Sequence, residues 1–133
     1  MKLELVKNRP EFYEFMRLLR NHQEVQSGFI EWVDVTPEQQ QVYMQKYADH
    51  YWIGLCDGQP AGYIGEIDGD IRIATHPDHQ RKGVASFMLS EFVRRFPQVF
   101  AKVKVDNEAS LRLFRKAGFQ ERFLILYPPD ASR

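Results

Sequence analysis

Cysteine is almost absent from this 133-residue chain, in which Cys56 is the only one. An internal disulfide is therefore excluded, and so are the cysteine-rich spacings of structural zinc sites. This usage fits a reducing compartment, and we expect a cytoplasmic protein. The four histidines include no helical i, i+4 pair and no accompanying cysteine ligand, so we expect no metal cofactor.

Long apolar runs and an excess of one charge are also missing. Nowhere do about 18 uncharged apolar residues run together, and the start of the chain has no signal-peptide core, so we expect neither membrane insertion nor secretion. The 18 Lys and Arg residues balance 18 Asp and Glu residues. A chain of zero net charge has no general field to attract nucleic acid, and we expect none as a partner.

What is present indicates a globular chain. Apolar residues make up 44% of it and aromatic residues 14%, and no low-complexity tract interrupts them. A chain of this length buries enough surface for one core. We therefore expect a single domain spanning residues 1–133.

The first fifty residues contain signals for one strand and two helices. Leu3–Val6 alternates as a short strand does. A stripe at i, i+3, i+4, i+7 predicts a helix to about Arg20, and its members are Phe12, Phe15, Met16 and Leu19. Thr36 followed by Pro37 and Gln39 is a capping box, which predicts a second helix to about Asp49. The intervening segment, 21–35, is less regular.

Two Asp-Gly turns organise the middle of the chain. Tyr51–Cys56 and Ala61–Ile67 are typical of strands, and Asp57-Gly58 between them is typical of a hairpin turn. A second such turn, Asp68-Gly69, precedes a strand that begins near Ile71 and ends before Pro77. Three antiparallel strands are predicted.

The last part of the chain alternates helix and strand. Helical period from Ala85 to Phe96 predicts a long helix, and Val103 with Val105 indicates a further strand. A short helix, 109–117, with Gly118 as its cap, and a strand at 123–127 follow. This order predicts a right-handed parallel crossover between the Ile71 and Val103 strands. The fold class is α/β, with a mixed, mostly antiparallel sheet of about six to seven strands flanked by about four helices.

The loop from Thr75 to Ala85 carries the clearest chemical signal. It leads from a strand end to the start of the long helix, where unpaired N–H groups and the helix dipole suit a pyrophosphate. Gly83 lets a phosphate approach the backbone, and Arg81 and Lys82 add positive charge.

Two segments of the chain resemble one known family. The first, Gln80 to Ala85, is similar to the Gln/Arg-x-x-Gly-x-Gly/Ala coenzyme A signature of the GCN5-related N-acetyltransferase (GNAT) superfamily. The second is similar to that family's Asn-x-x-Ser/Ala segment and comprises Asn107, Ser110, Leu113, Phe114, Gly118 and Phe119. The resemblance covers about Trp52–Tyr127. It implies a GNAT-like fold and an N-acetyltransferase that uses acetyl-CoA as cosubstrate.

The resemblance also implies where acetyl-CoA binds. The pantetheine arm would lie in the gap between the splayed Ile71 and Val103 strands, with Ile73 and Thr75 contributing main-chain groups. The cofactor-binding residues carried over are Ile73, Ala74, Thr75, Gln80, Arg81, Lys82, Gly83, Val84, Ala85, Ser86, Asn107, Ser110 and Phe114. The primary amine would attack the thioester directly, because Cys56 is expected to be a buried core residue.

The catalytic groups are less sharply defined. A lysine-like amine must lose a proton before it attacks, and Glu66 or Asp70 is the candidate base, with Glu66 slightly favoured. Many family members carry Tyr where this chain has Phe114, and that hydroxyl can protonate the departing thiolate. Tyr127 or Tyr63 would take its place, or solvent would, or the thiolate would leave unprotonated.

The acceptor remains open. Arg20-Asn21 followed by Val25 is similar to a segment of relatives that acetylate amino-sugar nucleotides or ribosomal-protein N-termini. We expect a small-molecule amine as the partner, for example an amino sugar. The alternatives are a protein N-terminal or lysine acetyltransferase and a non-catalytic acyl-CoA-binding regulatory module. Many relatives dimerise, so a homodimer is a further expectation.

Overall fold

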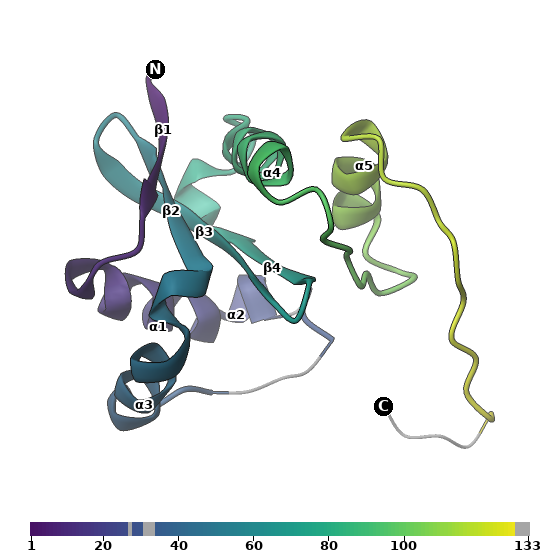
Figure 1. The fold of residues 1–133 in the computed structure, drawn as a ribbon, viewed down its shortest axis with the longest axis horizontal. Helices are drawn as coiled ribbons and strands as arrows, with labels where there is room; N and C mark the ends of the chain where they lie inside the picture. Colours follow the sequence, from purple (N-terminus) through teal and green to yellow (C-terminus); the bar gives the residue numbers. More distant parts are fainter. Residues whose placement is uncertain (27, 31–33, 130–133) are drawn as a thin grey trace.

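A computed structural model describes residues 1–26, 28–30 and 34–129, and Figure 1 shows it as a ribbon. Its sheet has the order β1-β2-β3-β4, and all three pairings are antiparallel. The strands are β1 Leu3–Lys7, β2 Tyr51–Cys56, β3 Gln59–Ile67 and β4 Asp70–Thr75. β4 therefore forms one edge of the sheet, and this edge is central to the site described below.

Helices cover both faces of this sheet. On one face lie α1 (Tyr13–Asn21), the short α2 (Gln23–Gln26) and α3 (Pro37–Tyr47), and on the other lies α4 (Val84–Arg95). α5 (Glu108–Lys116) follows beyond α4, and three 3₁₀ turns lie at 10–12, 48–50 and 77–79. No helix in the described ranges has the length and apolarity that crossing a membrane would require.

The local signals account for most element boundaries. Thr36 Oγ1 accepts from the Gln39 N–H (3.1 Å) and Gln39 Oε1 accepts from the Thr36 N–H (2.9 Å), so the predicted capping box is confirmed. Both Asp-Gly turns have positive φ at each residue, 51° and 82° at Asp57 and Gly58, as a tight hairpin requires. The predicted hairpins are therefore confirmed.

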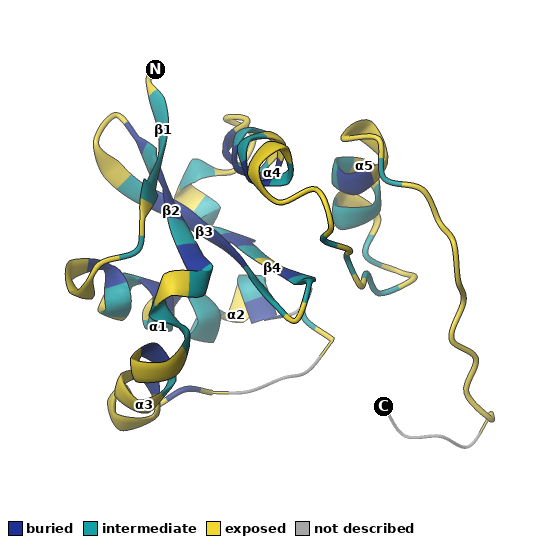
Figure 2. Cartoon of the chain, viewed as in Figure 1, coloured by how far each residue is buried: buried dark blue, intermediate teal, exposed yellow. Residues whose placement is uncertain are grey.

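Two apolar clusters pack against the two faces of the sheet, whose central strands β2 and β3 are largely dark blue in Figure 2. On the α4 face the buried side chains include Ile64, Met88, Leu89 and Phe92. On the α1 and α3 face they include Phe12, Met16, Leu19, Tyr51 and Tyr63. Cys56 is buried in the first cluster, so its expected place in the core is confirmed.

The number of strands is where the sequence prediction is wrong. Within the described residues the sheet has four strands rather than six to seven, and five α-helices rather than four, because a single turn, α2, lies in the segment expected to be irregular. The parallel crossover is reduced to one bridge between Asp70 and Phe100. Beyond that bridge the chain leaves β4, and Val105 is 92% exposed.

The predicted strand at 123–127 is also not formed. Figure 1 shows the segment after α5 running away from the sheet, and Figure 2 shows it as exposed. A run of apolar side chains there remains in solvent, namely Phe123, Leu124, Ile125, Leu126 and Tyr127. An extended segment becomes a strand only when its backbone finds a partner, and periodicity in the sequence does not supply one.

Candidate functional site

The outer edge of β4 offers unpaired backbone groups. The Ile71 N–H donates outward to the Phe100 carbonyl (2.9 Å), whereas the His76 N–H donates inward to Ala61 of β3 (2.7 Å). Successive residues of a strand direct their N–H groups to opposite sides, so Ile73 and Thr75 direct theirs outward, as Ile71 does. No other strand in the described part of the chain pairs with this edge.

The loop after β4 leads directly to the start of α4. The Phe87 N–H donates to the Gly83 carbonyl (3.0 Å), which is the first bond of the helix. In the described structure the N–H groups of Val84, Ala85 and Ser86 precede that bond and have no partner, and Gly83 supplies no side-chain cap. These N–H groups lie at the positive end of the helix dipole, where they can bind an anion.

The local backbone fits a bulky anion above this turn. Gly83 has φ of 78°, and a Cβ built there would meet nothing within 4 Å, so the space over it is open. Arg81 also adopts positive φ (65°), and Gln80, Arg81 and Lys82 are exposed around the turn. A pyrophosphate could therefore approach the main chain while two cations lie beside it.

Two buried polar atoms flank the loop without a partner. Thr75 Oγ1, at the end of β4, and His79 Nδ1, in the loop, are buried and have no hydrogen bond in the described structure. Buried polar groups in proteins are nearly always paired, so such atoms mark a place where a ligand or water completes the structure. They lie on the same stretch as the unpaired N–H groups of α4.

The second predicted segment lies at the start of α5. Asn107 Oδ1 accepts from the Ser110 N–H (3.1 Å) and so caps the helix, while its Nδ2 donates to the Gly28 carbonyl (3.3 Å). Phe114 is buried in the α4-face cluster, with its ring 5.1 Å from that of Phe119. The structure thus connects α5 to α4 through Phe114 and to the α1 side through Asn107.

The three candidate catalytic groups do not converge. Glu66 pairs in register with Ile71, four residues or about 13 Å along β4 from Thr75, and faces α4 rather than α1. Its carboxylate accepts from the Gly69 N–H (2.7 Å) and lies 3.3 Å from His50 Nδ1.

Asp70 and Tyr127 lie elsewhere. The Asp70 carboxylate is 3.5 Å from Arg72 and 3.6 Å from Lys102, at the far end of β4 from the loop that leads to α4. Tyr127 lies in the segment after α5 and is 53% exposed. The predicted cofactor-binding residues from Thr75 to Ser86 therefore lie on one stretch, whereas the candidate base and acid are separated from it.

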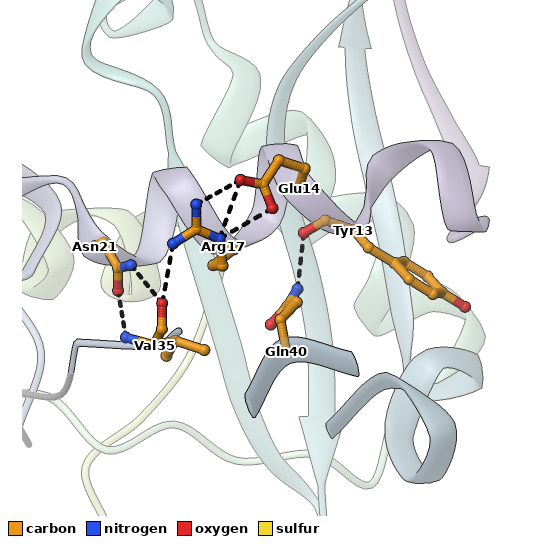
Figure 3. Close-up of polar contacts among 6 residues, drawn as sticks. All are labelled: Tyr13, Glu14, Arg17, Asn21, Val35 and Gln40. Carbon is orange, nitrogen blue, oxygen red and sulfur yellow. Dashed lines mark hydrogen bonds and ion pairs between the residues drawn. The ribbon is translucent and has the colours of Figure 1, made fainter. Parts of the chain in front are cut away.

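The face that carries α1 and α3 is held by polar contacts, drawn in Figure 3. Asn21 binds both backbone groups of Val35 (2.8 Å each), and Arg17 binds the Val35 carbonyl (3.1 Å) as well as Glu14. The Gln40 amide donates to the Tyr13 carbonyl (2.8 Å) and ties α3 to α1. Asn21 of the Arg20-Asn21 pair thus has a structural role.

The structure brings together residues near this face that the sequence did not place side by side, although Arg20 and Tyr63 were each named for other reasons. The His22 ring at the end of α1 lies 5.7 Å from the His76 ring, so the α1 side contacts the loop between β4 and α4. Arg20, Tyr43, Tyr51 and Tyr63 line a small pocket between α1, α3 and the sheet. These residues come from separate elements, so spacing in the sequence could not bring them together.

The free β4 edge, the turn at Gly83 and the open start of α4 define a class of protein: an α/β fold whose strand edge and helix N-terminus could receive a phosphate-bearing ligand. The profile of the acetyltransferase (GNAT) family matches residues 11–119. The chain belongs to this family and is an acetyl-CoA-dependent acetyltransferase. The family predicted from the two motifs is confirmed.

Solved structures with the same fold support this assignment. A spermidine N-acetyltransferase from Vibrio cholerae, in complex with CoA and spermine, has a TM-score of 0.79 at 17% identity, covering 91% of this chain and 82% of its own. A putative acetyltransferase from Salmonella typhimurium with acetyl-CoA has a TM-score of 0.74 at 18% identity (89% and 79% covered). The aminoglycoside acetyltransferase AAC(6')-Ib with coenzyme A has a TM-score of 0.70 at 17% identity (91% and 86% covered).

Identities this low establish the fold and leave the acceptor undetermined. A comparison with curated protein sequences gave no significant match.

Proposed function

We propose that this enzyme transfers the acetyl group of acetyl-CoA to a primary amine of a small molecule. The observation that carries the proposal is one continuous stretch, Thr75–Ser86, in which a free strand edge leads into an uncapped helix N-terminus. A coenzyme A molecule has the matching parts, an amide-bearing arm and a pyrophosphate. The neighbours with spermine and aminoglycoside in their names support a small amine as acceptor.

The proposed binding mode assigns a role to each group. The outward N–H groups of Ile73 and Thr75 would pair with the pantetheine arm, as an added strand pairs with a sheet edge. The pyrophosphate would accept from the first N–H groups of α4, with Arg81 and Lys82 beside it. Asn107 and Ser110 would border the arm from the α5 side, where the Asn107 amide already reaches Gly28.

Transfer then needs a neutral amine and a stabilised oxyanion. An amine with a pKa near 10.4 is about 0.1% neutral at pH 7.4, so a base, a water chain or an amine of low pKa must act. Glu66 and Asp70 are the candidate bases from sequence, and both carboxylates already have partners. The outward N–H groups near Thr75 could donate to the tetrahedral oxyanion.

The departing thiolate needs a source for its proton, because Phe114 supplies no hydroxyl. Burial raises the pKa of Tyr63 to about 12, despite the opposing effect of Arg20. A free thiol has a pKa near 8.5, so the buried phenol holds its proton more tightly than the departing thiol would. Tyr63 is thus a poor proton donor, and we propose that the thiolate leaves unprotonated or takes its proton from water.

Binding of acetyl-CoA can be tested with two matched glycines. Gly83 and Gly58 both have positive φ, 78° and 82°, and neither has an atom within 4 Å of a built Cβ. Glutamate at either site therefore imposes the same strain, but only Gly83→Glu places a carboxylate over the proposed pyrophosphate. We expect acetyl-CoA at a hundredfold excess over its dissociation constant to stabilise the wild type and Gly58→Glu by about 2.7 kcal/mol.

Thermal unfolding with and without acetyl-CoA is the measurement. Gly83→Glu should lose the rise in melting temperature while Gly58→Glu keeps it. An equal rise in melting temperature in both variants would show that the pyrophosphate does not bind at this turn. No rise in the wild type would refute the proposed site.

A second candidate function is motivated by Phe114, which is 7% exposed and packed against Phe119. A chain without the tyrosine hydroxyl could serve as an acyl-CoA-binding regulatory module. Release of coenzyme A thiol on a panel of amines decides between the two, since the module would bind acetyl-CoA and release none.

A further inference from the structure

A small pocket lies between α1, α3 and the sheet, on the face opposite α4. It is lined by Arg20, Gln40, three tyrosines and two methionines. It is half open to solvent and encloses room for about one water-sized group, so a larger ligand would sit at its mouth. Of the described residues that line it, none is Asp or Glu, and Arg20 is the only cation. The pocket is therefore electropositive as well as polar.

Arg20 is not neutralised by a carboxylate anywhere in the described ranges. Its recorded contact is with the ring of Tyr43, whose centroid is 5.8 Å from the guanidinium carbon. Arg17, on the same helix, is by contrast paired with Glu14 and bonded to Val35. An arginine without a carboxylate partner, at the wall of a pocket, is available to bind an anion bidentately.

The tyrosines add neutral donors beside this cation. The Tyr43 and Tyr51 hydroxyls share a hydrogen bond of 2.7 Å. Tyr63 is only 6% exposed and lines the same pocket. Burial raises the pKa of Tyr63 to about 12 and raises that of Tyr51 as well, so both phenols stay protonated at neutral pH and can donate.

The position of the pocket relates it to the proposed reaction. Tyr63 lies directly opposite Ala74 of β4, so its side chain shares the α1 face with that residue. One residue further along β4 is Thr75, where we place the end of the pantetheine arm. A group in the pocket would therefore lie one strand from the thioester, on the side that α4 leaves free.

We infer that Arg20 and the Tyr63 hydroxyl bind an anionic group of the acceptor, a carboxylate or a phosphate. The inference rests on the proposed acetyl transfer and narrows its substrate class. An amine that also carries an anionic group could place that group at the mouth of this pocket beside Arg20, whereas a polyamine would place positive charge against Arg20. Arg20 is thus assigned as a specificity residue, and Tyr63 as a hydrogen-bond donor.

Paired acceptors that differ by one anionic group test this assignment. Glucosamine 6-phosphate is compared with glucosamine, 4-aminobutyrate with butylamine, and spermidine is the cationic member. Release of coenzyme A thiol gives kcat/KM for the wild type, Arg20→Gln and Arg20→Lys. Arg94→Gln is the matched control, because Arg94 is an exposed arginine at the C-terminal end of α4.

We expect the wild type to favour one anionic member over its partner by about tenfold, chiefly through KM. Arg20→Gln should abolish this preference for the anionic acceptor, Arg20→Lys should keep part of it, and Arg94→Gln should leave it unchanged. The phosphate and carboxylate pairs show which anion is used. Equal rates within both pairs, faster turnover of spermidine, or an unchanged ratio in Arg20→Gln would overturn the inference.

A binding measurement covers the case in which none of these amines is turned over. Glucosamine 6-phosphate and 4-aminobutyrate are titrated into ¹⁵N-labelled enzyme, and NMR shifts of the Arg20 side chain and the Tyr63 amide are followed. A saturable shift in the wild type that Arg20→Gln lacks supports the subsite, and no shift with either compound refutes it. If acetyl-CoA failed to raise the melting temperature of the wild type, the proposed function itself would instead be refuted.

Discussion

At the scale of single residues, the position of Glu66 on β3 determines which role its carboxylate can have. The sequence places it on the strand beside β4, which made it the favoured base. Its two oxygens are engaged by the Gly69 N–H and His50, at the hairpin end of β3 and on the α4 face. About 13 Å of β4 separates this point from Thr75. The geometry favours a structural role, in which Glu66 holds the turn that joins β3 to β4.

Glu66→Gln tests the two roles of this carboxylate. The amide oxygen can still accept from Gly69, so we expect the variant to fold and the acidic limb of its kcat–pH profile to be unchanged. Loss of that limb, with a large fall in kcat, would instead identify Glu66 as the base. Asp70→Asn tests the other candidate base in the same way, because the Asp70 carboxylate pairs with Arg72 and Lys102.

At the scale of elements, α5 depends on the Asn107 side chain, which makes two different contacts. Asn107 caps the helix through its oxygen, and its amide nitrogen reaches the Gly28 carbonyl on the α1 side. Serine at this position can cap the helix but is too short to reach Gly28 as well. Substitution can therefore separate the helix cap from the contact with Gly28.

We expect Asn107→Ala to lower the free energy of unfolding by about 1 kcal/mol and Asn107→Ser to lower it by less, because serine remains a good cap. Both variants should weaken acetyl-CoA binding, since both lose the amide. Urea unfolding and calorimetric titration of acetyl-CoA measure the two effects. Full acetyl-CoA affinity in Asn107→Ser would show that the residue acts only as a cap.

Elements that depend on local signals were predictable from the sequence, and those that depend on partners were not. The capping box at Thr36 and the Asp-Gly turns specify backbone geometry within a few residues, and the structure confirms them. The strands at 103–105 and 123–127 require a distant strand to pair with, which alternation alone does not provide. The site divides in the same way: Gln80–Ala85 is contiguous and was predicted, whereas the Arg20 and Tyr63 pocket joins α1 to β3 and was not.

At the scale of the whole molecule, most of the chain is organised around the sheet, and the segment after α5 is not. Apolar side chains there are largely exposed, from 89% at Phe123 to 53% at Tyr127. A run of exposed apolar residues is costly in water, and its backbone has no ladder partner among the described strands. This arrangement makes the segment the most accessible apolar stretch of the chain.

Limited digestion with chymotrypsin tests that arrangement, because the protease cleaves after aromatic and large apolar residues. Cleavage requires an extended, accessible backbone, so we expect the first cuts within 123–127. The equally apolar strand β2 should be cut much later, since its residues are paired on both sides and its cleavage needs global opening. The product that lacks the segment should keep its circular dichroism and its stabilisation by acetyl-CoA, because Thr75–Ser86 and Asn107 remain. Protection of 123–127 equal to that of β2 would contradict the structure and would favour the strand predicted from the sequence.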